Sequence, residues 1–212
     1  PSADFPVEAL VEEMLSEIPP LSLAILIEAI SGYEVYDWKG QQQGALEKAA
    51  LDALVLINER GVESKRVNEV GNYVEEYITE TLQEQGFQVD TPLTQSGRRR
   101  STGYPDLEAF FGETLFYIEV KTYNPDNVNT TQRSFYLSPS RNPKVIQEAY
   151  HLLIAFAMVP HPEEPKTWVS KGVQFLDLYN LQCDLKFEFN ASNRDLYNPE
   201  AGLVFFKSEA GD

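Results

Sequence analysis

Three charged side chains, Asp106, Glu119 and Lys121, stand where they could meet at one edge of a β-sheet. Residues 115–123 are rich in β-branched and aromatic side chains and are predicted to form a strand, in which alternate side chains share a face. Glu119 and Lys121 therefore point to the same side, together with Tyr117. Burying charges costs several kcal/mol unless they are paired or bind a metal ion, so this strand needs a chemical reason for them.

Asp106 could bring a second carboxylate to the same place. It begins the preceding predicted strand, residues 106–111, directly after Pro105. If the two strands pair through the turn at residues 112–114, Asp106 comes close to Glu119. The plain alternative for the whole set is a structural ion pair on an exposed face of the sheet.

Two converging carboxylates suit Mg²⁺, which prefers hard oxygen ligands and keeps several of its waters. The backbone carbonyl of Val120, between Glu119 and Lys121, could supply a further ligand. Such an ion would polarise a substrate phosphate and lower the pKa of a bound water. Lys121 would orient or deprotonate that water and offset the negative charge that develops on the phosphate.

The helix expected ahead of these strands has the clearest pattern in the chain. Its apolar stripe repeats every 3.6 residues, and Gly86 ends the helix. The stripe consists of Val67, Val70, Val74, Tyr77, Ile78, Thr81 and Leu82. Most acidic residues of the helix lie opposite the stripe and face water, but Glu75 falls at its edge. Taken alone, such a residue is a boundary carboxylate with a solvated tip.

The order Pro105-Asp106, twelve intervening residues and Glu119-Val120-Lys121 resembles the signature of the PD-(D/E)XK nuclease superfamily. That resemblance implies that Asp106, Glu119 and the Val120 carbonyl hold the metal ion.

A second pattern, G-x3-E-x6-L-x3-G-F, is formed by Gly71, Glu75, Leu82, Gly86 and Phe87. It is similar to the helix before the core sheet in archaeal Holliday-junction resolvases and in many restriction enzymes of the superfamily. The resemblance covers residues 67–123 in total. It implies that Glu75 joins the metal site as well.

The remaining elements are expected to complete an α/β fold, a restriction-endonuclease-like core in which helices flank a central mixed β-sheet. Further strands are expected at residues 87–93, 135–137, 168–179 and 181–189, and a mostly apolar helix at residues 144–158. His151 would lie on the surface or boundary of that helix, and it is given no catalytic role.

An N-terminal helical extension, residues 1–60, is expected to pack on the nuclease core, residues 61–212. Its helices are predicted at residues 7–15, 21–30 and 45–57, and they end at Pro19-Pro20, Gly32 and Gly61. A packed accessory layer or a dimerisation element suits these acidic helices better than a separate binding module.

The net charge of the chain bears on whether it can bind nucleic acid. The 212 residues carry a formal net charge of -16, but residues 97–151 hold six acids and seven bases. A locally basic surface can still bind a polyanion, because the field within a Debye length matters most.

The single cysteine, Cys183, excludes an intrachain disulfide, and two histidines are too few for an ordinary structural zinc site. No signal peptide or membrane-spanning run is visible, so we expect a cytoplasmic protein that uses neither a membrane nor an organic cofactor.

Basic side chains on both sides of the predicted site are the expected DNA contacts. Three adjacent arginines precede Asp106, and further bases lie in or at the end of the long polar stretch after Lys121. The set consists of Arg98, Arg99, Arg100, Arg133, Arg141 and Lys144. For the three adjacent arginines the alternative is a solvated charge run. For the stretch after Lys121 it is a plain connecting loop.

We therefore expect a Mg²⁺-dependent endonuclease that hydrolyses phosphodiester bonds in double-stranded DNA, foremost a sequence-specific type II restriction enzyme. A homodimer is expected, because cutting both strands of a palindrome favours two-fold symmetry. The alternatives are a junction-resolving or repair nuclease of the same superfamily, and a catalytically idle acidic interaction protein with the same fold. The charge of -16 favours the idle protein, whereas the intact set Asp106, Glu119 and Lys121 argues against it.

Overall fold

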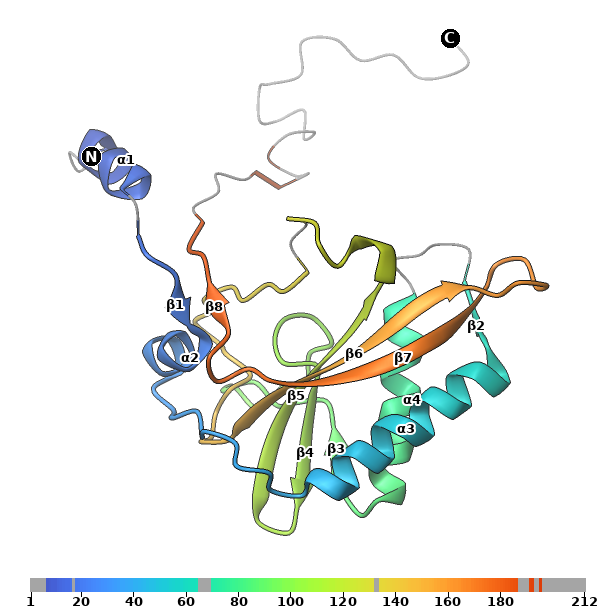
Figure 1. Cartoon of the computed structure of the whole chain (residues 1–212). Helices are drawn as coiled ribbons and strands as arrows, with labels where there is room; N and C mark the ends of the chain where they lie inside the picture. The colour runs from blue at the N-terminus through green and yellow to red at the C-terminus, as the bar shows by residue number, and fades with distance from the viewer. Residues whose placement is uncertain are drawn as a thin grey trace, which may run out of the picture. The chain divides into compact units, whose positions relative to one another are not determined.

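The computed structural model describes residues 7–16, 18–64, 70–131, 134–186, 191, 192 and 195 (Figure 1). The chain divides into two compact units. One unit, Pro1–Pro20 with Asp184–Asp212, contains helix α1 (Val7–Leu15) in its described part. The other, Leu21–Cys183, contains the remaining helices and strands. The domain boundary expected at residue 60 stays a prediction.

A six-stranded mixed sheet forms the centre of the larger unit, in the order β2-β7-β6-β5-β4-β3. Within this sheet β5 and β6 run parallel and the other neighbours antiparallel. The sheet curls, and its two long strands β6 and β7 bend together (Figure 1). The strands are β2 (Val62–Glu63), β3 (Gln88–Asp90), β4 (Leu107–Phe111), β5 (Thr114–Tyr123), β6 (Tyr150–Pro160) and β7 (Thr167–Asp177). The expected central mixed sheet is therefore confirmed.

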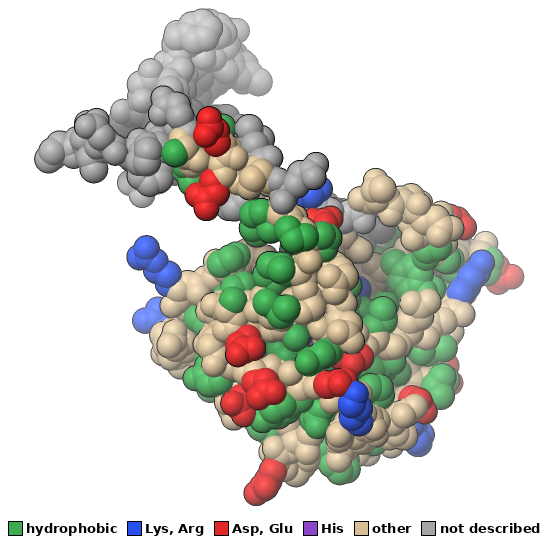
Figure 2. Space-filling model, turned by 60° about the vertical axis from the view of Figure 1, so that its left-hand side comes forward, with side chains coloured by type: hydrophobic (Ala, Val, Ile, Leu, Met, Phe, Trp, Pro, Cys, Tyr) green, Lys and Arg blue, Asp and Glu red, His purple; other side chains and the backbone are tan. Residues whose placement is uncertain are grey.

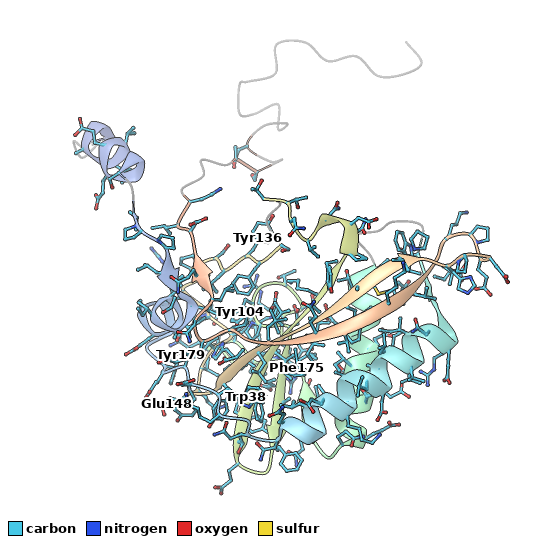
Figure 3. The ribbon with its side chains drawn as sticks, in the orientation of Figure 1. Trp38, Tyr104, Tyr136, Glu148, Phe175 and Tyr179 are labelled. Atoms are coloured by element: carbon cyan, nitrogen blue, oxygen red, sulfur yellow. The ribbon has the colours of Figure 1, made fainter. Side chains whose placement is uncertain are left out.

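Helices α3 (Gln43–Arg60) and α4 (Val70–Glu84) pack together against one face of this sheet (Figure 1). The predicted stripe of α4 is largely confirmed, because five of its described members are almost fully shielded from solvent: Val70, Val74, Ile78, Thr81 and Leu82. Tyr77, the remaining described member, is only half-buried. Val67 lies outside the described residues. The stripe belongs to a core cluster that includes alternate residues of β5 and is flanked by Phe175 of β7 (Figure 3).

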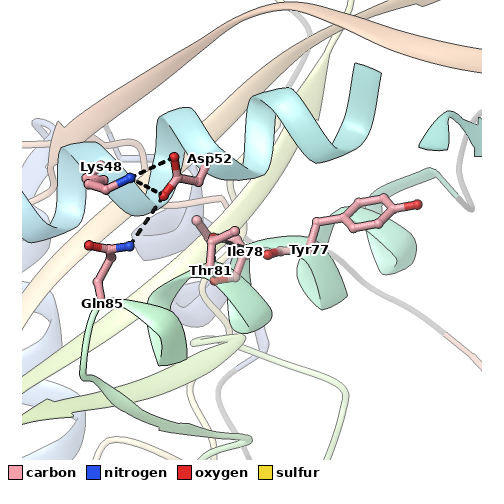
Figure 4. Close-up of polar contacts among 6 residues, drawn as sticks. All are labelled: Lys48, Asp52, Tyr77, Ile78, Thr81 and Gln85. Atoms are coloured by element: carbon pink, nitrogen blue, oxygen red, sulfur yellow. Dashed lines mark hydrogen bonds and ion pairs between the residues drawn. The ribbon is translucent and has the colours of Figure 1, made fainter. Parts of the chain in front are cut away.

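Polar contacts join α3 to the end of α4 (Figure 4). Lys48 Nζ lies 2.7 Å from Asp52 Oδ2 one turn along α3, and Gln85 Nε2 donates to the same oxygen at 3.3 Å. The buried Thr81 hydroxyl donates to the carbonyl oxygens of Tyr77 and Ile78, at 3.1 and 3.3 Å. This hydroxyl is satisfied within its own helix, so it can lie in an apolar core without cost from a lost hydrogen bond.

Helix α2 (Leu23–Ser31) covers the opposite face of the sheet, beside the short strand pair β1 (Leu21–Ser22) and β8 (Gln182–Cys183). Ser22 caps α2 by accepting a hydrogen bond from the Ile25 N–H, and the N–H of Gly32 at its end donates to the Glu28 carbonyl. Gly32 has a φ of +79°, a left-handed conformation that favours glycine. The N-terminal chain thus supplies the second covering layer.

The prediction of a helix at residues 144–158 is wrong. The chain is irregular up to residue 149 and then forms β6, a central strand between β5 and β7. Both faces of β6 are covered, so its buried residues form a continuous apolar run rather than alternating with polar ones. Such a run cannot be distinguished from a buried helix by periodicity alone.

Two further expectations change in detail. Residues 135–137 form no strand but belong to an irregular crossover from β5 to β6, whose described part contains the short 3₁₀ helix η2 (Pro125–Asn127). The strand expected at residues 181–189 is limited to β8 in its described part, and residues 187–189 lie outside it. None of the helices among the described residues is long and apolar enough to span a membrane.

Candidate active site

The hairpin of β4 and β5 brings Asp106 to the middle of β5. Leu107 pairs with Ile118 across the hairpin, so Asp106 lies one step further along, opposite Glu119. Asp106 Oδ2 accepts a hydrogen bond from the Val120 N–H at 2.9 Å. Gly112, with a φ of +61°, allows the tight turn that sets this register.

Glu119 and Lys121 form a close ion pair on the face of β5 that points away from α3 and α4. Glu119 Oε1 lies 2.5 Å from Lys121 Nζ, and the Glu119 side chain is only 5% exposed. Its other oxygen, Oε2, is buried and has no hydrogen-bond partner among the described residues. A buried carboxylate oxygen without a donor is costly, and a bound cation would satisfy it.

The pKa values of two carboxyl groups link Glu75 to the same site. Burial and then the negative charge of Asp106 raise the pKa of Glu75 to about 7, against the opposing charge of Lys121. Burial and the charge of Asp106 likewise raise the pKa of Glu119 to about 7, again opposed by Lys121. Glu75 on α4 is half-buried at the edge of its stripe, close enough for the charges of Asp106 and Lys121 to act on its pKa.

Lys121 keeps its proton more firmly than an ordinary lysine. Burial lowers its pKa, but the charges of Glu119, Asp106 and Glu75 outweigh burial and raise the pKa overall. An ammonium group in this position can orient a water or stabilise negative charge on a phosphate. It is poorly suited to removing a proton from water near neutral pH.

A divalent cation with oxygen ligands fits these residues. Among the described residues, no three His, Cys, Asp or Glu side chains are grouped closely enough to hold a metal by themselves. Asp106 and Glu119 can nevertheless provide two carboxylates, with a backbone carbonyl beside them and waters completing the shell, as Mg²⁺ prefers. A cation would satisfy the Glu119 oxygen that has no partner, and it would offset the negative charge of Asp106 that, after burial, raises the pKa of Glu75 and of Glu119.

Lys144 has a different position from the one expected for a DNA contact. It is 4% exposed, and its Nζ donates to the carbonyl oxygens of Gly103 and Pro105 at 2.6 and 2.8 Å. Burial lowers the pKa of Lys144 although Asp106, Glu119 and Glu75 raise it. A buried ammonium with two carbonyl partners cannot reach a phosphate on the surface, so we drop Lys144 from the DNA contacts. It fastens the chain directly ahead of Asp106.

Replacing Lys144 with methionine should lower the free energy of unfolding by about 1–3 kcal/mol, the cost of leaving a buried carbonyl without its donor. Urea unfolding measures the change, and Lys171→Met on the exposed surface of β7 is the matched control. Equal stability of the two variants would contradict the role given to Lys144.

The arginines expected to contact DNA differ in their surroundings. Arg99 is held by its own protein, because its guanidinium lies 2.6 Å from Asp90 Oδ2 and 3.6 Å from Glu108 Oε1. Arg98 and Arg100 are exposed, and neither forms an ion pair with the described residues. Arg141 is also exposed. Arg133 lies outside the described residues.

Sequence reasoning missed a buried aromatic pair behind the carboxylates. His151 lies on β6, fully buried, and its Nδ1 is 2.7 Å from the Tyr104 hydroxyl. The two rings stack with centroids 5.8 Å apart. Burial lowers the pKa of His151 to about 3, so the ring is neutral. The apolar residues that follow His151 in the sequence indicate a core position. Because a helix was predicted there, His151 was placed on the surface or boundary of that helix instead.

Comparisons with known proteins identify the family to which this sequence is similar. Residues 19–200 match the model of the type II restriction enzyme MjaV family. The chain is also similar to a protein of Methanocaldococcus jannaschii described as "Type II restriction enzyme MjaV", with 32% identity over 96% of this chain and 95% of that protein. The match includes every residue of the candidate site.

Proposed function

Since the chain belongs to the type II restriction enzyme MjaV family, we propose that it is a Mg²⁺-dependent endonuclease that hydrolyses both strands of a specific double-stranded DNA sequence. The observation that carries the proposal is the convergence of Asp106, Glu119 and Lys121 on adjacent positions of the β4–β5 hairpin. A structural ion pair would explain the Glu119–Lys121 contact, but not the second carboxylate or the buried oxygen without a partner.

Each residue has a distinct role in this proposal. The carboxylates of Asp106 and Glu119 and the Val120 carbonyl hold Mg²⁺, and Glu75 supports the site from α4. The bound ion supplies an activated water and a Lewis acid for the scissile phosphate. Lys121, as an ammonium, orients the attacking water and stabilises the charge that develops on the phosphate oxygens. The Val120 N–H keeps the Asp106 carboxylate pointed at β5.

Cleavage of plasmid DNA with Mg²⁺ tests the proposal directly. Discrete fragments support a restriction enzyme, and mapping their ends gives the recognition sequence and the cut position. Cutting of branched DNA alone would indicate a junction-resolving nuclease instead. Binding without any cutting would favour the idle interaction protein, and the net charge of -16 is the observation in favour of that reading.

We also propose that the enzyme works as a homodimer, since two-fold symmetry places one active site on each strand of a palindrome. Sedimentation of the protein with and without its DNA measures this. A monomer on the cleaved duplex would contradict it.

Arg98 and Arg100 are the proposed phosphate contacts of the loop ahead of β4. Each neutralised phosphate contributes about 0.9 to the slope of log affinity against log salt. Arg98→Ala and Arg100→Ala should therefore each reduce that slope by about 0.9 in fluorescence anisotropy titrations. Lys171→Ala, which removes an exposed base from β7, should leave the slope unchanged. An unchanged slope for both arginine variants would show that these arginines are solvated charges that do not contact DNA phosphates.

A further inference from the structure

A cavity of about 370 Å³ lies on the same side of the sheet as Glu119 and Lys121. Three segments surround it: the end of α2, the loop before β4, and the crossover between β5 and β6. Tyr104 and Tyr136, which come from the last two segments, both contribute to its wall (Figure 3). Its volume falls within the range of about 300–1,000 Å³ that is usual for small-ligand sites.

The charge of the cavity contrasts with that of the chain. Asp and Glu make up 33 of the 212 residues, and acidic side chains are scattered over the face shown in Figure 2. No Asp or Glu of the described chain lines the cavity, whereas the exposed Arg100 does, and Lys144 lies in its wall with its ammonium held by two carbonyls. Hydroxyl groups of Thr102 and Ser138 add neutral hydrogen-bonding positions. This chemistry suits an anion that also carries hydrogen-bonding groups, as a nucleotide does.

Hydrogen bonds hold the walls of the cavity together. The side chain of Asn142 accepts from the Ser96 N–H at 2.9 Å and donates to the Ser96 hydroxyl at 3.0 Å. The Gln95 N–H donates to the Pro143 carbonyl at 2.9 Å. Lys144 joins the same two segments through its bonds to Gly103 and Pro105. These bonds tie the loop before β4 to the end of the crossover on one side of the cavity.

The cavity is also continuous in sequence with the candidate active site. Gly103 and Tyr104 line it, and Asp106 follows two residues after Tyr104. The Tyr104 ring stacks on His151, which in turn contacts Tyr117, two positions before Glu119 on β5. The cavity and the candidate site therefore share the segment of residues 103–106 ahead of β4.

We propose that this cavity binds one nucleotide of the DNA substrate after its base has left the helical stack. The inference rests on the proposed endonuclease function. A stacked base pair inside a duplex cannot enter a cavity of about 370 Å³, so a DNA substrate could fill it only with a single extruded nucleotide. Arg100 meets its phosphate, and the hydroxyl groups of Thr102 and Ser138 bond its polar edge.

Fluorescence of 2-aminopurine tests the proposal, because this base analogue is quenched in a duplex and becomes bright when it is unstacked. Once end mapping has given the recognition sequence, the analogue is placed at each position in turn. Binding is measured in Ca²⁺, which takes oxygen ligands as Mg²⁺ does, after a check that no strand is cut. We expect a severalfold rise in fluorescence at a position in or beside the cut site.

A matched pair of variants assigns that rise to the cavity. Ser138→Phe fills the cavity and should abolish the rise while duplex binding stays measurable by anisotropy. Ser134→Phe adds the same ring at an exposed position of the crossover that does not line the cavity, and it should keep the rise.

Three results would overturn the inference, and only the third would also overturn the proposed function. If every position stays quenched while the protein binds and cuts its DNA normally, the inference is wrong and the proposed function stands. A rise that Ser138→Phe leaves intact would place the unstacked base elsewhere. Absence of both binding and cutting would instead refute the proposed function, and the inference with it.

Discussion

Replacing Glu119 with glutamine should slow DNA cleavage by at least about 10²–10³-fold, the usual loss when one preorganised electrostatic group is removed from an active site. The amide keeps the size of the side chain but cannot hold a divalent cation as the carboxylate does. Cleavage should be followed in single turnovers with excess enzyme, so that binding does not limit the rate. Glu113→Gln, in the exposed turn of the same hairpin, is the matched control and should cut at the normal rate.

The same variant separates a functional carboxylate from a structural ion pair. In the folded protein the pKa of Glu119 is raised to about 7 by burial and by Asp106, so near pH 8 its charge opposes folding. Glutamine resembles the protonated form, and without metal Glu119→Gln should be at least as stable as the parent protein. If it is instead less stable and still cleaves DNA, the Glu119–Lys121 pair serves the fold rather than the reaction. A stabilised but inactive variant is the result expected of a residue kept for function.

The positions of Asp106, Glu119 and Lys121 could be predicted because they depend on short-range geometry. A two-residue turn joins β4 to β5, so strand alternation and hairpin pairing fix which side chains meet. Glu75 follows from helical periodicity, which places it at the edge of a stripe that the structure buries. The catalytic roles of these four residues stay predictions.

The features that sequence reasoning missed depend on packing between segments that lie far apart in the sequence. Whether residues 150–160 form a helix or a strand depends on β5 and β7 on either side. Both strands were predicted, but their pairing with residues 150–160 is not visible in a local pattern. The partners of Lys144 lie about forty residues earlier in the chain, so its charge suggested a surface contact rather than a buried bond. His151 was misplaced for the same reason, since Tyr104 reaches it from a separate loop.

Stability without metal and affinity for Mg²⁺ should change with pH in opposite directions. The carboxyl groups of Glu75 and Glu119 have pKa values raised from 4.5 to about 7, chiefly by burial and then by Asp106. In the folded protein they hold protons that the unfolded chain loses at lower pH. Their contribution to stability is therefore complete below about pH 4.5 and is lost as the pH rises through about 7. Mg²⁺ requires the deprotonated carboxylates, so its binding strengthens over the same interval and releases protons.

Mg²⁺ should consequently raise the unfolding midpoint little at about pH 6 and much more at about pH 8, since a ligand stabilises a protein according to its affinity for the folded state. Thermal unfolding with Mg²⁺ or with EDTA at the two pH values measures the difference, and no DNA is needed. Glu119→Gln removes one of the titrating ligands and should flatten the response, whereas Glu113→Gln should retain it. An equal effect of Mg²⁺ at both pH values would show that neither raised carboxyl group binds the ion, and the metal site would then have to be sought away from the β4–β5 hairpin.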